Sequence, residues 1–271
     1  ESLLVLKNNR GVEDNRVRHM DYSVQINKTL YNRLIKGQSI TLFSPSDVDG
    51  LYDAFCEDQD LFEKLYTKYE KDPSIRKREL KATELFSMLM QERASTGRIY
   101  IQNVDHCNTH GSFIESVAPI RMSNLCQEVL IPTKPLNDVN DENGEIGLCT
   151  LAAINLGEIT DLNKDMDNLC DLVVRSLDAL LDYQDYPVKA AEISTLNRRM
   201  LGVGVINFAY YLAKNGLKYS DGSANDLTHE TFESLQYHLL KASNNLAKEM
   251  GACNYFNETK YSQGLLPIDT Y

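Results

Sequence analysis

The chain has 271 residues, 42% of them hydrophobic, which is enough for a sizeable core in one large domain or two small ones. Acidic residues outnumber basic ones by 39 to 28, and the net charge of −11 disfavours nucleic acid or an anionic membrane as the main partner. There is no long apolar run or signal-peptide pattern, and the six cysteines are too scattered for a secreted disulfide scaffold, so we expect a protein of the reducing cytoplasm.

The first 113 residues are predicted to contain short strands and longer helices. In chain order they begin with a strand or helix over 1–7, a helix over 24–35 and a strand over 40–43. A helix that contains Leu51, Phe55 and Phe62 follows, with Ser46 as its cap, and then a solvated charged helix face and turn over 66–78. The last three are an amphipathic helix over 79–92, a strand over 98–101 and a polar loop over 103–113.

The rest of the chain continues this alternation. The expected elements are a strand or finger-like loop over 122–131, a loop over 132–143, a buried strand over 146–154, a helix over 169–183, a strand over 200–206, and helices over 207–214 and 231–248. Short apolar strands that alternate with longer helices favour an α/β architecture with a largely parallel sheet or barrel.

An amide, a thiol and a carboxylate stand at alternate positions in Asn124, Cys126 and Glu128. In an extended strand or finger-like loop, these side chains would point the same way and, if buried, would need polar partners such as a substrate. Glu128 would then serve as a general base and Asn124 would orient a hydroxyl. The carboxylate disfavours a thiolate at Cys126, which favours chemistry through the neutral thiol. The alternative is a structural cysteine that packs as a small hydrophobe.

A second thiol, Cys149, follows on the predicted strand over 146–154, beyond the loop over 132–143. A thiol at a strand tip, a loop and a thiol on the next strand form an arrangement suited to chemistry between cysteines. The function predicted from the residues depends mainly on Cys126 and Cys149.

Other polar motifs have simpler interpretations. Residues 105–110 contain Asp, His and Cys, but no second ligand group at the spacing of a zinc site, so we expect a hydrogen-bonded loop and no metal. Gly202 and Gly204 lack the third glycine of a dinucleotide fingerprint and are interpreted as packing positions. Tyr210 and Tyr211 are expected to pack in a core. Three further cysteines are expected to be inert: Cys56, Cys170 and Cys253.

Six idiosyncratic stretches are spread along nearly the whole chain. They are Asn15-Arg-Val-Arg-His-Met-Asp, Asp72-Pro-Ser-Ile-Arg-Lys, Glu92-Arg-Ala-Ser-Thr-Gly-Arg-Ile-Tyr, Ser123-Asn-Leu-Cys-Gln-Glu, Pro132-Thr-Lys-Pro-Leu-Asn-Asp and Gly202-Val-Gly-Val-Ile-Asn. With these stretches and Cys149, the sequence resembles the large (α) subunit of class I ribonucleotide reductase, in particular the Ia type of bacteria and phages.

The resemblance implies a ten-stranded α/β barrel made of two half-barrels, with a central finger loop that carries Cys126. It implies that residues 1–271 are an internal portion of this catalytic barrel domain. The N-terminal ATP-cone and the C-terminal part of the barrel would lie outside the chain, so the chain by itself is expected to be inactive.

The activity that the resemblance implies is reduction of ribonucleoside diphosphates to 2′-deoxyribonucleoside diphosphates. Cys126 would form the thiyl radical that abstracts the 3′ hydrogen, Glu128 would take the 3′-hydroxyl proton and Asn124 would hydrogen-bond the substrate. Cys149 would be one of two thiols that reduce the 2′ position and form a disulfide, with its partner outside this chain. The expected substrate-binding set is Ser123, Asn124, Glu128 and Leu151.

The resemblance also implies partners. They are a second α subunit, a β subunit that houses a dimetal–tyrosyl radical, and thioredoxin or glutaredoxin as the dithiol reductant. ATP and dNTP effectors would bind outside this segment, and no cofactor is expected on it. Two alternatives stay open: an adenosylcobalamin-dependent (class II) reductase, and one piece of a split chain that is inactive until complemented.

Overall fold

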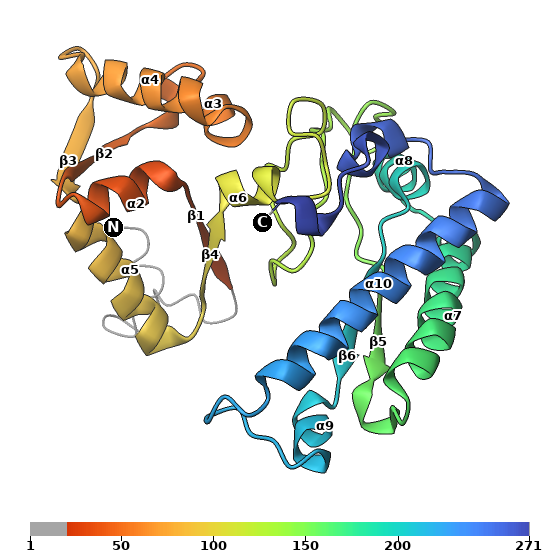
Figure 1. Ribbon diagram of the computed structural model, residues 1–271. Coiled ribbons are helices and arrows are strands. Elements are labelled where there is room, and N and C mark those ends of the chain that lie inside the picture. Colours follow the sequence, from red (N-terminus) through yellow and green to blue (C-terminus); the bar gives the residue numbers. More distant parts are fainter. Residues whose placement is uncertain (1–20, 271) are drawn as a thin grey trace, which may run out of the picture. The chain divides into compact units, whose positions relative to one another are not determined.

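The computed structural model describes residues 21–270, which fall into two compact units (Figure 1). The first unit consists of the described parts of Glu1–Pro132 and Glu258–Tyr271, and the second unit of Thr133–Asn257. The predicted element over 1–7 and the stretch that begins at Asn15 lie outside the described residues.

The first unit contains two pairs of strands and several helices (Figure 1). Strand β1 (Tyr22–Ile26) pairs in parallel with β4 (Ile99–Asn103), and β2 (Ser39–Phe43) pairs antiparallel with β3 (Lys77–Lys81). The helices are α2 (Lys28–Ile35), α3 (Leu51–Glu57), α4 (Gln59–Lys71), α5 (Ala82–Thr96) and α6 (Val104–Thr109), followed near the C-terminus by the 3₁₀ turns Lys260–Gln263 and Pro267–Thr270.

The predicted helix over 24–35 is wrong in its first part, because Val24 and Ile26 lie in β1. The two residues lie two apart, which is the strand period, whereas Ile26 and Leu30 have the helical spacing of four. The change occurs at Asn27, whose extended backbone ends the strand. The Asn27 Oδ1 accepts a hydrogen bond from the Thr29 N–H at 3.2 Å, which caps the N-terminus of α2.

Three further predictions for this unit are wrong. Ser46 caps no helix, because α3 begins after Gly50 in the left-handed conformation. Phe62 belongs to the separate helix α4, which Asp58 caps by accepting from two backbone N–H groups. The predicted polar loop over 103–113 contains α6. The charged stretch over 66–78 holds the end of α4 and a turn at Pro73, as predicted, although Tyr66 is buried and β3 begins at Lys77.

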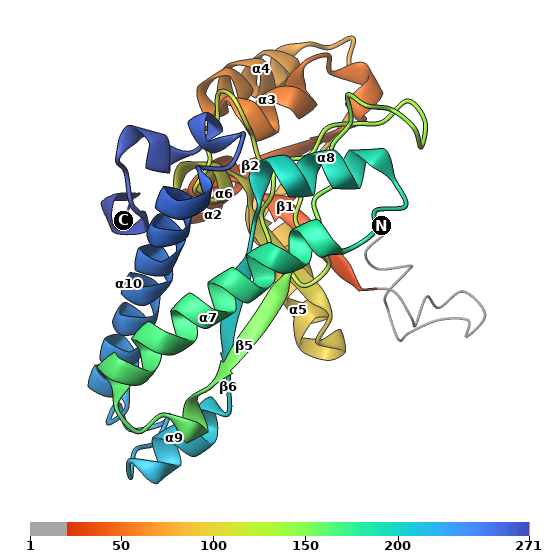
Figure 2. The ribbon, with the colours of Figure 1, turned by 90° about the vertical axis from the view of Figure 1, so that its right-hand side faces the viewer.

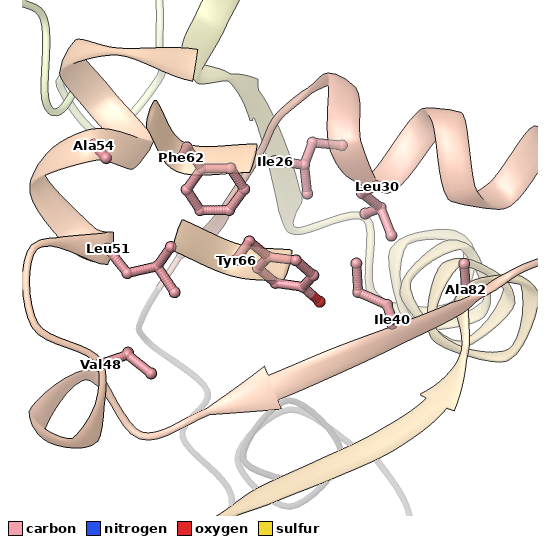
Figure 3. Close-up of a cluster of buried hydrophobic side chains, with 9 residues drawn as sticks. All are labelled: Ile26, Leu30, Ile40, Val48, Leu51, Ala54, Phe62, Tyr66 and Ala82. Atoms are coloured by element: carbon pink, nitrogen blue, oxygen red, sulfur yellow. The ribbon is translucent and has the colours of Figure 1, made fainter. Parts of the chain in front are cut away.

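Tyr66 lies in the core of the first unit, which packs α4 against β2, α2 and α3 (Figure 3). The buried side chains are Ile26, Leu30, Ile40, Val48, Leu51, Ala54, Phe62, Tyr66 and Ala82. The Tyr66 hydroxyl donates to the Thr41 carbonyl at 2.7 Å and accepts from the Thr41 N–H at 2.6 Å, so its polar end is satisfied inside the core. Burial raises the pKa of Tyr66 to about 12.

The second unit has two helices between its two strands and two further helices after the second strand (Figure 2). Strand β5 (Leu151–Asn155) pairs in parallel with β6 (Gly202–Ile206). The helices are α7 (Leu162–Tyr183), α8 (Lys189–Arg198), α9 (Phe208–Lys214) and α10 (Asn225–Met250), with a 3₁₀ turn at Leu156–Glu158. Helices α7 and α10 lie side by side, and Arg175 on α7 makes a two-point ion pair with Glu249 on α10, each contact at 2.7 Å.

The mixed α/β class predicted from the sequence is confirmed. Two of the three strand pairs are parallel and one is antiparallel, and residues 21–270 form three two-stranded sheets without closing a barrel. Of the two expectations for 122–131, a strand or a finger-like loop, the structure excludes the strand, because that segment is an irregular loop with a turn. The predicted strand over 146–154 begins only at Leu151, which is 52% exposed and not buried.

Candidate active site

The segment that carries Asn124, Cys126 and Glu128 forms a tight turn. The Gln127 N–H donates to the Asn124 carbonyl and the Asn124 N–H to the Val129 carbonyl, each at 3.3 Å. Gln127 takes a left-handed backbone conformation, with φ at +66°. Side chains at alternate positions point the same way only in an extended strand, and the turn interrupts that geometry. The backbone therefore gives no reason for Asn124, Cys126 and Glu128 to point in one direction.

The side chains of this turn divide into supporting and accessible groups. The Asn124 Oδ1 accepts from the Val129 N–H at 3.1 Å, and the Ser123 hydroxyl donates to the Asn124 carbonyl at 2.9 Å. Cys126 is an exposed free thiol and Glu128 is exposed as well. Among residues 21–270, the Asn124 Nδ2 has no hydrogen-bond partner. The turn therefore offers a thiol, a carboxylate and an amide donor to a molecule that binds there.

Cys149 lies in the second unit, two residues before β5, and is also an exposed free thiol. The residue after it, Thr150, is buried, and its carbonyl accepts from the Gly202 N–H at 2.9 Å. This bond extends the β5–β6 ladder by one residue toward Cys149. Leu151 follows as the first residue of β5. Thus Ser123, Asn124, Cys126 and Glu128 are brought together in one turn, and Cys149 and Leu151 at the start of one strand.

A buried ion pair holds the chain just before Cys149. Arg198, at the end of α8, donates to Glu145 through Nε at 2.7 Å, and the two side chains are 2% and 1% exposed. The Lys134 Nζ contacts the same carboxylate at 2.5 Å, and the Arg198 guanidinium lies over the ring of Tyr255. Burial opposes ionisation of Glu145, but the hydrogen bonds from Arg198 and Lys134 outweigh it and hold the pKa of this carboxyl below its usual value.

Sequence reasoning missed this pair because 53 positions separate its partners and no local spacing connects them. It also missed α8, which carries Arg198. The only local signal is a strongly basic helix end at Arg198 and Arg199, and that is more often exposed.

The motifs that were given simpler interpretations mostly have structural roles. The Asp105 Oδ2 accepts from the Lys28 N–H at 2.9 Å, at the start of α6. Within the described part of the chain, no group of three His, Cys, Asp or Glu residues could hold a metal ion. Tyr211 is buried, as predicted, whereas Tyr210 is exposed, contrary to prediction. Burial raises the pKa of the Cys56 thiol, and that of Cys170 to about 11.

The comparison with protein families tests the resemblance. The family model described as "Ribonucleotide reductase, barrel domain" matches residues 1–271. The chain belongs to this family. The family expected from the sequence motifs is therefore confirmed.

Individual reductase subunits are similar to the chain over its whole length. It is 74% identical to the ribonucleoside-diphosphate reductase subunit alpha of Haemophilus influenzae and 72% identical to the ribonucleoside-diphosphate reductase 1 subunit alpha of Escherichia coli, and it covers 36% of each. It is 55% identical to the subunit alpha of Enterobacteria phage T4, of which it covers 35%. The chain thus spans about a third of the length of these reductase subunits. No helix within residues 21–270 is long and apolar enough to cross a membrane.

Proposed function

We propose that the protein containing this chain is the large subunit of a class I ribonucleotide reductase, which reduces ribonucleoside diphosphates to 2′-deoxyribonucleoside diphosphates. The observation that carries the proposal is the exposed Cys126 thiol on a turn with Asn124 and Glu128, in a chain that matches the reductase barrel domain over its whole length. The names of its relatives, subunit alpha of ribonucleoside-diphosphate reductase, favour this assignment over a cobalamin-dependent enzyme.

In this mechanism Cys126 acts as a one-electron catalyst. Its thiyl radical takes the 3′ hydrogen atom from the ribose, which leaves a C3′ radical and a Cys126 S–H. Glu128 accepts the 3′-hydroxyl proton, and the amide of Asn124 donates a hydrogen bond to the substrate. The exposure of the thiol and carboxylate and the partnerless amide nitrogen of Asn124 among residues 21–270 support these roles.

The reducing electrons come from a pair of thiols. The 2′ hydroxyl leaves as water after it receives a proton, and Cys149 with a thiol from outside this chain supplies two electrons and two protons and becomes a disulfide. The hydrogen atom then returns from Cys126 to C3′, which regenerates the thiyl radical. Exposure of Cys149 supports its role, because an external dithiol must reach the disulfide to reduce it. Ser123 and Leu151, beside Asn124 and Cys149, complete the proposed substrate-binding set.

The wider assembly belongs to the same proposal. A dimetal–tyrosyl radical in a β subunit would supply the oxidising equivalent that generates the thiyl radical at Cys126, and a second α subunit would complete the dimer. Thioredoxin or glutaredoxin would reduce the disulfide, and ATP and dNTP effectors would bind elsewhere in the subunit. A disulfide that forms and is reduced on each turnover fits the reducing cytoplasm.

We further propose that residues 1–271 are a portion of a ten-stranded barrel in which the turn with Cys126 is the finger loop. Parallel strands are normally covered on both faces and continue into a larger sheet. The parallel pairs β1–β4 and β5–β6 fit this pattern. A groove of about 660 Å³ beside β5 and α7, lined in part by Ile154, Leu169 and Leu172, is apolar surface that further strands of a barrel would cover.

The deciding experiment is reduction of CDP to dCDP with a candidate β subunit, a dithiol reductant and ATP. It compares the chain alone, the chain complemented with the remaining parts of the subunit, and the complemented Cys126→Ser variant. Turnover only in the complemented wild type supports the proposed reaction. The same result shows that the isolated chain is inactive until the rest of the subunit is added, as a piece of a split chain would be. Turnover that persists in Cys126→Ser refutes it, and activity that needs adenosylcobalamin instead of the β subunit favours a class II enzyme.

A further inference from the structure

We propose that Asn108 and Arg121 are positioning residues for the turn that carries Cys126. They fix the chain that enters the turn to α3 and α6, and thereby determine where the thiol meets its substrate. This inference deepens the proposed function and rests on it through the role of Cys126.

Asn108 is the main point of attachment. It lies on α6, is 4% exposed, and uses its side-chain amide to connect three segments. The Nδ2 donates to the carbonyls of Cys56 at 3.2 Å, Val104 at 3.0 Å and Ile120 at 3.0 Å, and the Oδ1 accepts from the Ile120 N–H at 2.7 Å. Cys56 lies on α3 and Val104 begins α6, so this side chain ties Ile120 to both helices.

The contact with Ile120 requires an amide. Asn108 donates to the carbonyl and accepts from the N–H of the same residue, as a neighbouring strand would do. A carboxylate of the same shape would accept from the N–H but place its second oxygen against the Ile120 carbonyl, and an apolar side chain would leave both backbone groups unpaired. Because Ile120 is itself buried, bulk water does not reach these backbone groups to replace the bonds.

Arg121 makes the second attachment, one residue closer to the turn. Its guanidinium pairs with Asp53 at 3.0 Å and with Glu57, both on α3. Its main-chain carbonyl accepts from the Gln25 Nε2 at 2.5 Å, and Gln25 lies on β1 beside Gln102 of β4, with 3.2 Å between their amides. Two consecutive residues are therefore held from the strand pair and from both helices.

The turn follows at once and is closed on itself. Only Met122 and Ser123 separate Arg121 from Asn124, whose backbone and side chain make the hydrogen bonds that close the turn at Val129. A turn closed in this way moves as one piece, so its position depends on the segment at its base. Loosening Ile120 and Arg121 would displace Cys126 without opening the turn.

Hydrogen-atom transfer is sensitive to such a displacement, because the reacting atoms must be held close and aligned, and a shift of about 1 Å costs on the order of 100-fold in rate. The test uses the full-length subunit with its β subunit and 3′-deuterated CDP. For Asn108→Leu, which keeps the approximate shape but removes the amide, we expect kcat to fall by about tenfold or more while KM stays within about twofold. The deuterium isotope effect on kcat should rise, because transfer of the 3′ hydrogen becomes slower relative to the other steps.

Arg121→Gln provides a variant that folds, since ion pairs of partly exposed side chains contribute little to stability. We expect kcat to fall by about threefold, again with a larger isotope effect. The matched control is Asn27→Leu. Asn27 is equally buried in the same unit, and its amide contacts Thr29 and Gln59, not the segment that enters the turn. It should lower the melting temperature as Asn108→Leu does, but keep the wild-type isotope effect and activity per folded molecule.

The outcomes separate the two levels of the proposal. A wild-type isotope effect in Asn108→Leu and Arg121→Gln, with activity lost only in proportion to the unfolded fraction, overturns the positioning role. If Asn108→Leu does not fold, Arg121→Gln alone decides. Activity retained in Cys126→Ser, measured in parallel, overturns the proposed function itself.

Discussion

Removing Glu145 alone should destabilise the segment that leads to Cys149 far more than removing an exposed ion pair. Glu145→Met takes away the carboxylate that neutralises Arg198, whose side chain is only 2% exposed. Leaving a buried charge without its partner costs about 3–5 kcal/mol. At about 1.4 kcal/mol per factor of ten, local opening of the segment should become about 100- to 4,000-fold more frequent.

The assay is hydrogen exchange of the full-length subunit, read at peptides that cover residues 134–150. Three backbone N–H groups report the opening of this segment directly. Lys134 and Glu145 donate to each other's carbonyls at 3.1 and 3.2 Å, and Ile146 donates to the Ala190 carbonyl at 3.1 Å. Local exchange is suitable because it isolates the opening of one segment and does not require the whole subunit to unfold in two states.

Two matched variants make the result interpretable. The double variant Glu145→Met/Arg198→Met removes both charges and should recover most of the protection, because buried pairs replaced together by apolar residues of similar volume often cost little. Arg175→Met removes the exposed pair with Glu249 in the same unit and should change exchange little, because solvent screens exposed ion pairs. If Glu145→Met changes exchange no more than Arg175→Met does, the argument from burial is wrong.

The pH dependence of this segment follows from the lowered pKa of Glu145. A carboxyl whose pKa is lower in the folded than in the unfolded state contributes stability above its unfolded value and loses it as the pH falls through its folded value. Protection of residues 134–150 should therefore be constant above the ordinary value of 4.5 and decrease below it, and Glu145→Met should not show this decrease.

Cys126→Ser should abolish reduction of CDP in the full-length enzyme while CDP binding, measured by equilibrium dialysis, stays within about twofold, because hydroxyl and thiol differ little in size but only the thiol forms the radical readily. Cys149→Ser should remove repeated turnover supported by dithiol, and an intact steady-state rate would exclude its redox role. Gly157→Ala should destabilise the second unit only slightly, by about 1 kcal/mol or less. A Cβ would lie 2.3 Å from the Asn207 Nδ2 and 2.9 Å from the Tyr210 ring, but these exposed side chains can move aside; a large loss of hydrogen-exchange protection around β5 would contradict this.

The elements that sequence reasoning located correctly are those with one clear periodicity. Strands β2 and β4 and helix α5 fall within a few residues of the predictions, and α7 ends where predicted but begins seven residues earlier, at Leu162. The prediction over 24–35 was wrong at its start because Ile26 lies two residues after Val24, the strand period, and four before Leu30, a helix spacing. Only the capping bond of Asn27 reveals the boundary.

The geometry at Cys126 could not be predicted from the sequence. The alternation of Asn124, Cys126 and Glu128 indicated the groups that we propose to react, but the backbone turn depends on a positive φ at Gln127, a residue type without preference for that conformation. No neighbouring glycine or proline marks it. The long-range hydrogen bonds that anchor the turn could not be predicted either, because Asn108 donates to the Cys56 carbonyl, which is 52 positions away in the sequence.

The two proposed reactive thiols share one structural logic. Each is exposed on irregular chain, and each follows a buried polar contact at short range: Glu145 lies four residues before Cys149, and Ile120 lies six residues before Cys126. An apolar contact would stabilise these segments as well, but it tolerates sliding, whereas a satisfied buried hydrogen bond or ion pair is strongly destabilised by displacement. Buried polar contacts thus favour a single position of the chain over adjacent ones, which suits a thiol that must meet a substrate atom accurately while remaining open to it.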